Sequence, residues 1–326
     1  MTYNIVLIGA GQLGSRHLQG LKKINIAINI EVVDPSIGSL AIAKERFEQV
    51  ENNEYIKSIR FLNSIDELNE SIDLCIIATN SNIRALVTEE LVAKKKIKTI
   101  IFEKILFQRI SDYKLVQDIL HKNKIKAWVN CPRRVFPDYI EIKKDIAPNE
   151  KLTFLLTGGN WGLACNGIHF VDLLAFLNNN NSFNFDSSGL DNDFQMSKRA
   201  GFIEFTGTLQ GKQSNGSDII INARNGSNAP HVITITGENS IFIIDETNGE
   251  IRMALSKNDW KWENKKLRVQ FQSQLTGDIA KEILTKGNCN LTSFDDSAQI
   301  HIPYISSILE FYNKSLKKIT ETLPIT

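Results

Sequence analysis

An α/β architecture is predicted from this sequence: a doubly wound parallel sheet comes first, and an α+β domain with a large, mostly antiparallel sheet follows. Strands and helices alternate through the first 130 residues, which is typical of βαβ units. The expected strands in this part, such as NIVLIG and DLCIIAT, are continuously apolar, as in sheets that are covered on both faces. After about residue 150, short β-like runs with glycine-containing breaks replace the alternation.

The first domain is expected to span residues 1–130. Its strands are predicted at Tyr3–Ile8, Ala27–Val33, Ile59–Leu62, Leu74–Ala78, Thr99–Glu103 and Lys126–Asn130. Amphipathic periodicity between them predicts helices at Leu13–Lys23, Gly38–Val50, Ile83–Lys95 and Asp112–Asn123. Strands that are joined by helices in this way pair in parallel, because the crossover returns the chain to the same edge of the sheet.

The second domain is expected to span residues 131–326, with helices on one face of its sheet. An apolar helix at Asn166–Leu177 is followed by an Asn-rich stretch, Asn178–Asn184, which predicts a solvated loop. Strands are predicted at Lys151–Thr157, Phe202–Leu209, Asp218–Ala223, His231–Thr236, Ser240–Asp245 and Glu250–Ala254. Hairpin turns are predicted at Asn215-Gly216, Asn225-Gly226 and Asn248-Gly249. Helices at Leu275–Thr285 and Phe294–Lys317 complete the domain, and we expect the final helix to pack back on the first domain.

Length and composition narrow the class of protein. The 326 residues correspond to about two domains at roughly 150 residues each. A balance of 38 Lys+Arg against 37 Asp+Glu argues against nucleic-acid binding through bulk charge and against a polybasic membrane anchor. We therefore expect no nucleic-acid or membrane partner and a cytoplasmic location. The four cysteines show no paired spacing, which argues against a metal site or a disulfide framework.

The turn after the first expected strand carries the motif G-x-G-x-x-G. Its members are Gly9, Gly11, Gln12, Leu13 and Gly14 together with Ala10, and a helix follows at once. Asp34 stands 20 positions beyond Gly14, at the end of the second strand. A chance glycine triplet in a surface turn would lack this setting, so we interpret the motif as a dinucleotide-binding Rossmann turn. Asp34 can accept hydrogen bonds from the ribose hydroxyls of NAD and would repel a 2′-phosphate, which favours NAD over NADP.

Several further segments together resemble one family, the Gfo/Idh/MocA oxidoreductases, along essentially the whole chain. The helix sequence GSRHLQGL, including Arg-His after the third glycine, is similar to the first turn and helix of the family. Ala78-Thr79-Asn80 resembles its A-T-P segment, and Glu103-Lys104-Ile105 resembles its E-K-P element. Arg133–Pro137 resembles R-R-F-x-P, and Gly167–Leu174 resembles G-x-H-x-x-D-L-L. The resemblance implies a cofactor site that includes Thr79, Asn80 and Glu103.

Lys104 and His169 are the candidate catalytic residues that the resemblance implies. Lys104 follows an apolar strand and would face the ligand crevice at the carboxyl end of a parallel sheet. The alternative is a surface lysine paired with Glu103. His169 and Asp172 are i, i+3 neighbours on an apolar helix and share one face. The alternative for them is a satisfied buried pair, whereas the resemblance makes His169 an acid/base and Asp172 a substrate-binding or His-orienting group.

Substrate binding is further assigned to Asn166, Cys165 and Arg134. Asn166 lies one turn before His169, where it could cap the helix or contact substrate. Arg133 or Arg134 could bind a carboxylate or phosphate with two parallel hydrogen bonds. The sequence departs from the family at three places that bear on the site. Cys165 stands where the family often carries Asp, Asn80 replaces the proline of A-T-P, and Ile105 replaces that of E-K-P.

The resulting expectation is an NAD(H)-dependent oxidoreductase that transfers a hydride to or from a carbohydrate carbon in the crevice between the domains. The substrate is expected to be a sugar nucleotide or nonulosonate-type sugar of bacterial surface-polysaccharide synthesis. Two alternatives stay open: a sensor or scaffold that binds dinucleotide and sugar without turnover, which Cys165 favours, and a redox-neutral NAD-dependent epimerase or lyase. The open face of the second sheet is expected to form a homo-oligomer, a dimer or a tetramer, as in the family.

Overall fold

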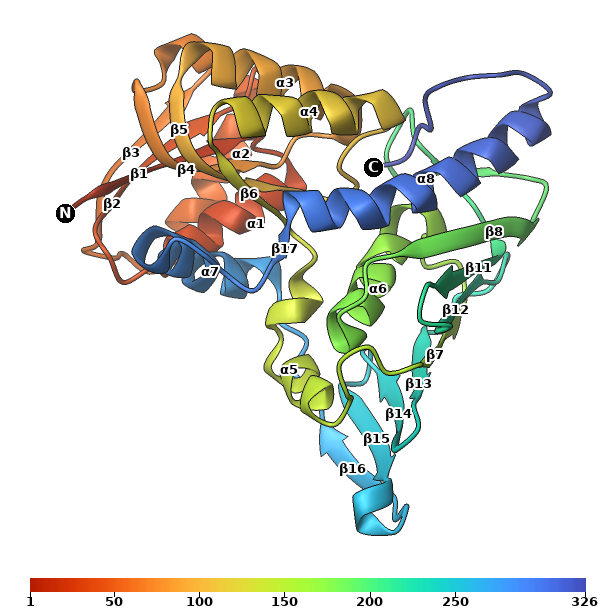
Figure 1. The fold of residues 1–326 in the computed structure, drawn as a ribbon. Coiled ribbons are helices and arrows are strands. Elements are labelled where there is room, and N and C mark those ends of the chain that lie inside the picture. Colours follow the sequence, from red (N-terminus) through yellow and green to blue (C-terminus); the bar gives the residue numbers. More distant parts are fainter. The chain divides into compact units, whose positions relative to one another are not determined.

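The chain divides into two compact units in the computed structural model, which describes residues 1–326. Unit 1 comprises residues 1–107, 111–130 and 270–294, and unit 2 comprises residues 108–110, 131–269 and 295–326. Unit 1 contains a parallel sheet and unit 2 contains a mostly antiparallel sheet (Figure 1). The predicted fold class is therefore confirmed.

Unit 1 is a twisted seven-stranded sheet in the order β17-β6-β5-β4-β1-β2-β3. Its strands are β1 (Tyr3–Ile8), β2 (Ile28–Val33), β3 (Ile56–Leu62), β4 (Ser71–Ile77), β5 (Lys96–Phe102), β6 (Lys126–Val129) and β17 (Thr292–Ser293). All pairs are parallel except β17–β6. Ile5, Val6 and Leu7 at the centre are completely buried, which explains why β1 is apolar on both faces.

Helices cover both faces of this sheet, as Figure 1 shows. They are α1 (Gln12–Leu21), α2 (Ile37–Glu48), α3 (Ser81–Lys94), α4 (Ile110–Lys122) and α7 (Gln272–Lys286). Helices α3 and α4 lie on one face, and α1 and α7 lie on the other. The order of strands reverses direction at β1, which has β2 on one side and β4 on the other. A ligand site is expected at the carboxyl ends of the strands at such a point.

The element that returns to unit 1 differs from the expectation. Residues 270–294, with α7 and β17, belong to unit 1, whereas residues 295–326 of the final helix and tail belong to unit 2. Two glycines explain the position of α7. A Cβ on Gly20 of α1 would lie 2.8 Å from the Thr276 Cβ, and one on Gly277 would lie 2.7 Å from the Gly20 carbonyl oxygen. The two helices therefore cross with their backbones nearly in contact.

Unit 2 is built on an eight-stranded sheet in the order β16-β15-β14-β13-β7-β12-β11-β8. Its strands are β7 (Thr153–Gly158), β8 (Phe183–Leu190), β11 (Gly207–Gln213), β12 (Asp218–Ala223), β13 (Val232–Thr236), β14 (Ser240–Asp245), β15 (Glu250–Leu255) and β16 (Glu263–Lys266). The small pair β9 (Gln195–Met196) and β10 (Ile203–Glu204) is separate. Helices α5 (Pro137–Lys144), α6 (Leu163–Asn178) and α8 (Phe294–Leu316) lie on one side of the sheet. No helix is both long and apolar enough to cross a membrane.

Three expectations for unit 2 are corrected. Strand β8 begins at Phe183, inside the predicted Asn-rich loop, because Phe183 and Phe185 stack and pair with β11. The run expected at Phe202–Leu209 is split between β10 and β11. Asn225-Gly226 does not form a hairpin, because β7 lies between β12 and β13 in the sheet. The other two Asn-Gly turns do join antiparallel neighbours.

Candidate functional site

The glycine turn between β1 and α1 is shaped by close backbone contacts. Gly9 has a φ of +94°, and a Cβ on it would lie 3.0 Å from the backbone nitrogen of Thr79. A Cβ on Gly14 would lie 1.8 Å from the carbonyl oxygen of Gly9, so α1 approaches the turn too closely for any side chain. Gly11 is the N-cap of α1, and no atom lies within 4 Å of its Cβ position. The start of α1 is therefore open to a phosphate group, which helix N-termini bind.

A cavity of about 460 Å³ adjoins this turn, at the carboxyl ends of β1, β2 and β4. The predicted cofactor residues that line it are Gly9, Gly11, Asp34, Thr79 and Asn80. Of the other predicted members, Gln12 is exposed in the first turn of α1, Leu13 is half-buried and Gly14 is buried. The cavity lies at the switch point of the sheet, where dinucleotides bind in this architecture.

Asp34 presents its carboxylate to this cavity in a fixed orientation. One carboxylate oxygen accepts a hydrogen bond from the Ala10 backbone N–H, and the other accepts one from the Ser36 N–H, both at 2.8 Å. None of the residues that line the cavity is a lysine or an arginine. A negative charge is thus held at the end of β2 with no cation in the lining to offset it.

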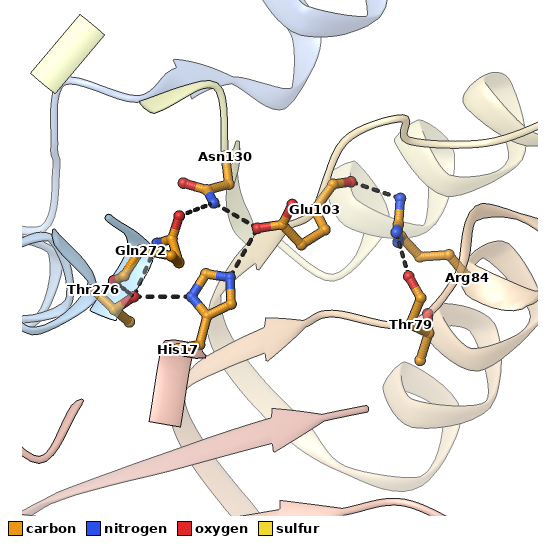
Figure 2. A network of polar contacts seen from close by, with 7 residues as sticks. All are labelled: His17, Thr79, Arg84, Glu103, Asn130, Gln272 and Thr276. Carbon is orange, nitrogen blue, oxygen red and sulfur yellow. Dashed lines mark hydrogen bonds and ion pairs between the residues drawn. The ribbon is translucent and has the colours of Figure 1, made fainter. Parts of the chain in front are cut away.

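Glu103 of the predicted Glu103-Lys104 element belongs to a polar network with His17, Asn130, Gln272 and Thr276 (Figure 2). Glu103 follows β5 and is 3% exposed. Its Oε1 contacts the His17 Nε2 at 2.8 Å and accepts a hydrogen bond from the Asn130 amide at 2.5 Å. The other His17 nitrogen contacts the Thr276 hydroxyl at 3.0 Å, and Asn130 also donates to Gln272 at 2.7 Å. The network joins α1, α7 and the ends of β5 and β6.

The charge state of Glu103 follows from these contacts. Burial raises the pKa of Glu103, but hydrogen bonds from His17 and Asn130, with the charge of Lys104, outweigh burial and lower the pKa below its ordinary value. Glu103 is therefore an internal carboxylate bound by the protein's own side chains. Lys104 next to it is only half-buried.

In unit 2, α6 begins at Leu163, three residues before the predicted start. Gly162 is the N-cap, and the buried Glu204 carboxylate accepts hydrogen bonds from the Ala164 and Cys165 N–H groups, both at 2.9 Å. Asn166 lies within the helix, where its amide donates to the Trp161 carbonyl at 3.0 Å. The capping interpretation of Asn166 is therefore wrong. Burial raises the pKa of Glu204 despite its hydrogen bonds with Cys165 and Ala164.

Asp172 of α6 forms an ion pair with Arg134, which lies in the short helical turn Pro132–Val135. The Arg134 Nε donates to the Asp172 carboxylate at 2.7 Å, and the two side chains are 14% and 1% exposed. His169, one turn earlier on this face of α6, is half-buried. The predicted residues His169, Asp172 and Arg134 are thus brought to one face of α6.

Arg133 has a different environment from Arg134. Its Nε and Nη2 both donate to the Glu246 carboxylate, with the Nε bond at 2.8 Å. Glu246 also accepts a hydrogen bond from the Tyr139 hydroxyl at 2.6 Å and contacts His231 at 3.3 Å. The guanidinium lies over the Phe170 ring at 4.1 Å. Arg133 is therefore part of a structural ion pair with Glu246. Arg134 also uses its Nε and Nη2, which donate to Asp172, and its role in substrate binding stays a prediction.

Sequence analysis missed three charged residues beside the predicted site: Arg84, Glu204 and Glu246. Two of them, Arg84 and Glu204, had a weak signal in the sequence. Arg84 lies at helical spacing with Ser81, Thr88 and Leu91 on the buried face of α3. Glu204 interrupts the apolar run Phe202–Phe205. A charged residue at a position that the pattern predicts to be buried requires a partner.

The comparisons with known proteins agree with this geometry. Residues 3–131 match the model of an oxidoreductase family with an NAD-binding Rossmann fold. A search of curated protein sequences found no match.

Three solved structures illustrate the shared fold. UDP-N-acetylglucosamine 3-dehydrogenase GnnA from Acidithiobacillus ferrooxidans has a TM-score of 0.68 at 13% identity, covering 94% of this chain and 97% of its own. Levoglucosan dehydrogenase in complex with NADH has a TM-score of 0.68 at 16% identity, covering 97% and 98%. A super-repressor mutant of Gal80p from Saccharomyces cerevisiae has a TM-score of 0.70 at 14% identity, covering 97% and 99%. At such identities the likeness establishes the fold alone.

Proposed function

We propose that this chain, whose residues 3–131 match the Gfo/Idh/MocA oxidoreductase family with its NAD-binding Rossmann fold, transfers a hydride between NAD(H) and a carbohydrate carbon. The observation that carries the proposal is the cavity at the switch point of the sheet, with the open N-terminus of α1 and the oriented Asp34 carboxylate. The half-buried Lys104 follows the neighbouring strand β5. These features supply a phosphate site, a ribose acceptor and an amine for proton transfer.

NAD is the preferred cofactor in this proposal. Both Asp34 oxygens are oriented by backbone N–H groups, so the carboxylate can accept hydrogen bonds from two ribose hydroxyls. A 2′-phosphate at about 4 Å from this carboxylate would be repelled by roughly 4 kcal/mol per unit charge at an effective dielectric constant of 20.

The variant Asp34→Arg is expected to reverse this preference. It removes the ribose acceptor and supplies a bidentate donor for a 2′-phosphate. The ratio of the Kd values for NADPH and NADH should fall by at least about tenfold, or ~1.4 kcal/mol. Fluorescence titration with each cofactor measures it. Glu90→Gln, which removes another carboxylate of the cavity lining, is the control and should leave the ratio unchanged. An unchanged ratio in Asp34→Arg would refute the role of Asp34.

Lys104 and His169 are proposed to handle the hydroxyl proton while the hydride leaves the carbon. Bound NAD supplies the hydride acceptor. In the oxidative direction the C–H bond breaks with its electron pair, and the hydroxyl proton passes to a base. General acid–base catalysis of this kind contributes about 10²–10⁴-fold. Asp172, Asn166, Arg134 and Cys165 are proposed to bind the substrate.

The substrate is proposed to be a sugar nucleotide or a nonulosonate-type sugar of surface-polysaccharide synthesis. Arg134 supports an anionic substrate, because its side chain is 14% exposed and a guanidinium can bind a carboxylate or phosphate in addition to Asp172. The dehydrogenases GnnA and levoglucosan dehydrogenase, which share the fold, are named for a sugar nucleotide and a sugar.

Turnover of a sugar panel tests the proposed function. Purified protein with NAD is incubated with neutral sugars, nucleoside diphosphate sugars and nonulosonates, and NADH absorbance is followed together with product formation. A net rise in NADH with one of these classes is the expected result. Product without a net change would identify a redox-neutral epimerase or lyase. A ligand that raises the melting temperature of the NAD-loaded protein without any product would identify a sensor.

The sensor is the second candidate, and two observations favour it. Cys165 stands where the family often carries an Asp, and its N–H is bound by the buried Glu204. One of the proteins that share the fold, Gal80p, is described as a super-repressor mutant. The panel above separates this candidate from the dehydrogenase.

We also propose that the helix-free face of the sheet in unit 2 binds a second copy of the chain. A row of side chains crosses this face through the paired positions Ile220, Leu155, Thr234 and Ile243, and all four are half-buried. β-Branched and leucine side chains in such a row would bury apolar area in a dimer.

Light scattering tests this assembly. The wild-type protein should have the mass of a dimer or tetramer, and the double variant Leu155→Lys/Ile243→Asp should have the monomer mass of 36.8 kDa, since buried charges oppose association. Glu48→Lys, on the exposed surface of α2, is the control and should keep the oligomer. A monomeric wild-type protein would refute the proposal.

A further inference from the structure

One buried arginine contacts two turns that the sequence analysis singled out separately. Arg84 lies on α3 and is 1% exposed. Its Nη1 donates to the carbonyl oxygens of Glu103 at 2.6 Å and Leu106 at 2.9 Å, and also to that of Ile105. Its Nη2 donates to the carbonyl oxygen of Thr79. Figure 2 shows the guanidinium between the Thr79 and Glu103 carbonyl groups.

The two turns have different tasks in the proposed site. The first follows β4 and places Thr79 and Asn80 in the lining of the dinucleotide cavity. The second follows β5 and carries Lys104 between Glu103 and Ile105, whose carbonyl groups both bind Arg84. The guanidinium thus fixes the backbone on both sides of Lys104, and it connects that backbone to the cavity lining.

Both turns also lack a proline that the resembled family carries. Asn80 replaces the proline of A-T-P, and Ile105 replaces that of E-K-P. Proline restricts φ to about −65° and so stiffens a turn. Asn80 has a φ of −64°, so the turn has the conformation of a proline without its covalent restraint. Each turn that lacks the ring has at least one carbonyl group bound by Arg84.

We propose that Arg84 is a positioning residue that replaces the restraint of the two missing prolines and holds Lys104 in register with the dinucleotide cavity. The five donors of a guanidinium are fixed in one plane, so a single side chain can hold several carbonyl groups at once. An ammonium group on a flexible stem cannot hold the same set with one geometry. The role of Lys104 in this inference rests on the proposed function.

The turn after β5 is also held through the side chain of its first residue, Glu103. The Glu103 carboxylate is bound by His17 and Asn130, while the Glu103 carbonyl group is bound by Arg84. Residue 103 is therefore fixed at both its side chain and its backbone. Beyond it, Arg84 of α3 also binds the carbonyl groups of Ile105 and Leu106. Loss of Arg84 should consequently loosen the segment that begins at Lys104.

The test compares Arg84→Met and Arg84→Lys with the wild-type protein. In both variants kcat should fall at least about tenfold, a change in barrier of ~1.4 kcal/mol, while KM for the sugar changes little. Added guanidinium ion should restore part of the kcat of Arg84→Met. The control is Arg60→Met, which removes another arginine of unit 1 that binds Glu31 and the Glu67 carbonyl group, and it should keep the wild-type kcat.

A second experiment adds the two prolines to Arg84→Met and is the more specific test of the proposal. Asn80→Pro and Ile105→Pro added to Arg84→Met should recover a large part of the lost kcat, because the covalent restraint returns where the hydrogen bonds were lost. A purely structural arginine would show a lowered melting temperature with no change in the kcat of the folded fraction, and that result would overturn the proposal. If Arg84→Met does not fold, the triple variant decides: a folded, active triple variant supports the proposal, and an unfolded or inactive one overturns it.

Hydrogen exchange tests the restraint of the two turns by Arg84 without any substrate. Amide exchange of residues 104, 106 and 107 should be faster in Arg84→Met than in the wild type, and the added prolines should slow it again, whereas exchange within β2 should not change. Unchanged exchange at residues 104, 106 and 107 would overturn the proposal. If the wild-type protein turns over no sugar, the proposed function fails while the exchange result still decides the role of Arg84.

Discussion

Replacing Lys104 by alanine is expected to lower kcat by about 10²–10⁴-fold, the usual contribution of one general acid or base. The side chain extends from the turn after β5, where Arg84 fixes the backbone on both sides of it and Glu103 is held by His17 and Asn130. Its loss removes the amine and leaves this frame in place. The Kd for NADH should therefore stay nearly unchanged, because Asp34 and the start of α1 are untouched. Steady-state kinetics and cofactor titration measure the two quantities.

The matched control is Lys98→Ala. Lys98 lies on β5, is exposed and pairs with Asp73 at 2.6 Å, so its removal should leave kcat unchanged. His169→Ala should also lower kcat by about two or more orders of magnitude as the second proton-handling group. A wild-type rate in Lys104→Ala would remove Lys104 from the mechanism, and a wild-type rate in His169→Ala would remove His169.

The parallel sheet was predictable because its pattern is strong and local. The apolar runs that became β1, β4 and β5 are buried on both faces, and only such strands read as continuous hydrophobic segments. The return of α7 to unit 1 was not predictable from periodicity. It depends on Gly20 and Gly277 meeting across more than 250 residues of chain, and a glycine in a helix shows no sign of the partner it will touch. The expected hairpin at Asn225-Gly226 failed for a similar reason, since β7 enters between its strands.

The candidate site was predictable to the extent that its chemistry follows the ends of strands. Asp34, Thr79 and Asn80 line one cavity because parallel strands bring their carboxyl ends to one edge. The side chains that fix this edge were missed, because their partners are backbone carbonyl groups and distant side chains. Arg84 binds the carbonyl of residue 106, and Glu204 binds the N–H groups of a helix that begins 41 residues earlier. Such contacts follow from tertiary structure. Their only sign in the sequence is a charged residue at a position that the pattern predicts to be buried.

Removal of the Glu246 carboxylate is expected to cause a large loss of stability. Glu246 is 6% exposed and Arg133 is 14% exposed, with the hydroxyl of Tyr139 on the same carboxylate. In Glu246→Ala, the mostly buried Arg133 remains without its carboxylate partner. Breaking such a pair from one side costs about 3–5 kcal/mol. Urea unfolding measures the loss in free energy of unfolding.

Two variants define the origin of that loss. Glu250→Ala removes an exposed carboxylate that pairs with Lys266 at 3.1 Å, and it should cost only about 0–1 kcal/mol. Arg133→Met/Glu246→Leu removes both charges and should recover most of the stability lost in Glu246→Ala, since apolar replacements of buried pairs are often neutral. A double variant as unstable as Glu246→Ala would show that lost packing, and not the uncompensated charge, causes the effect.

The acid limb of the stability profile checks the same pair independently. Burial would raise the pKa of Glu246, but the charge of Arg133 and hydrogen bonds from His231, Arg133 and Tyr139 hold that pKa far below its usual range. A carboxyl with a lower pKa in the folded state contributes stability that is complete above its unfolded pKa of about 4.3 and is lost as the pH falls further. The wild-type protein should therefore lose free energy of unfolding below about pH 4 more steeply than Glu246→Gln, which has no carboxyl to protonate. Parallel profiles in that range would mean that Glu246 is not the ionised partner of Arg133, and the expected loss in Glu246→Ala would then need another cause.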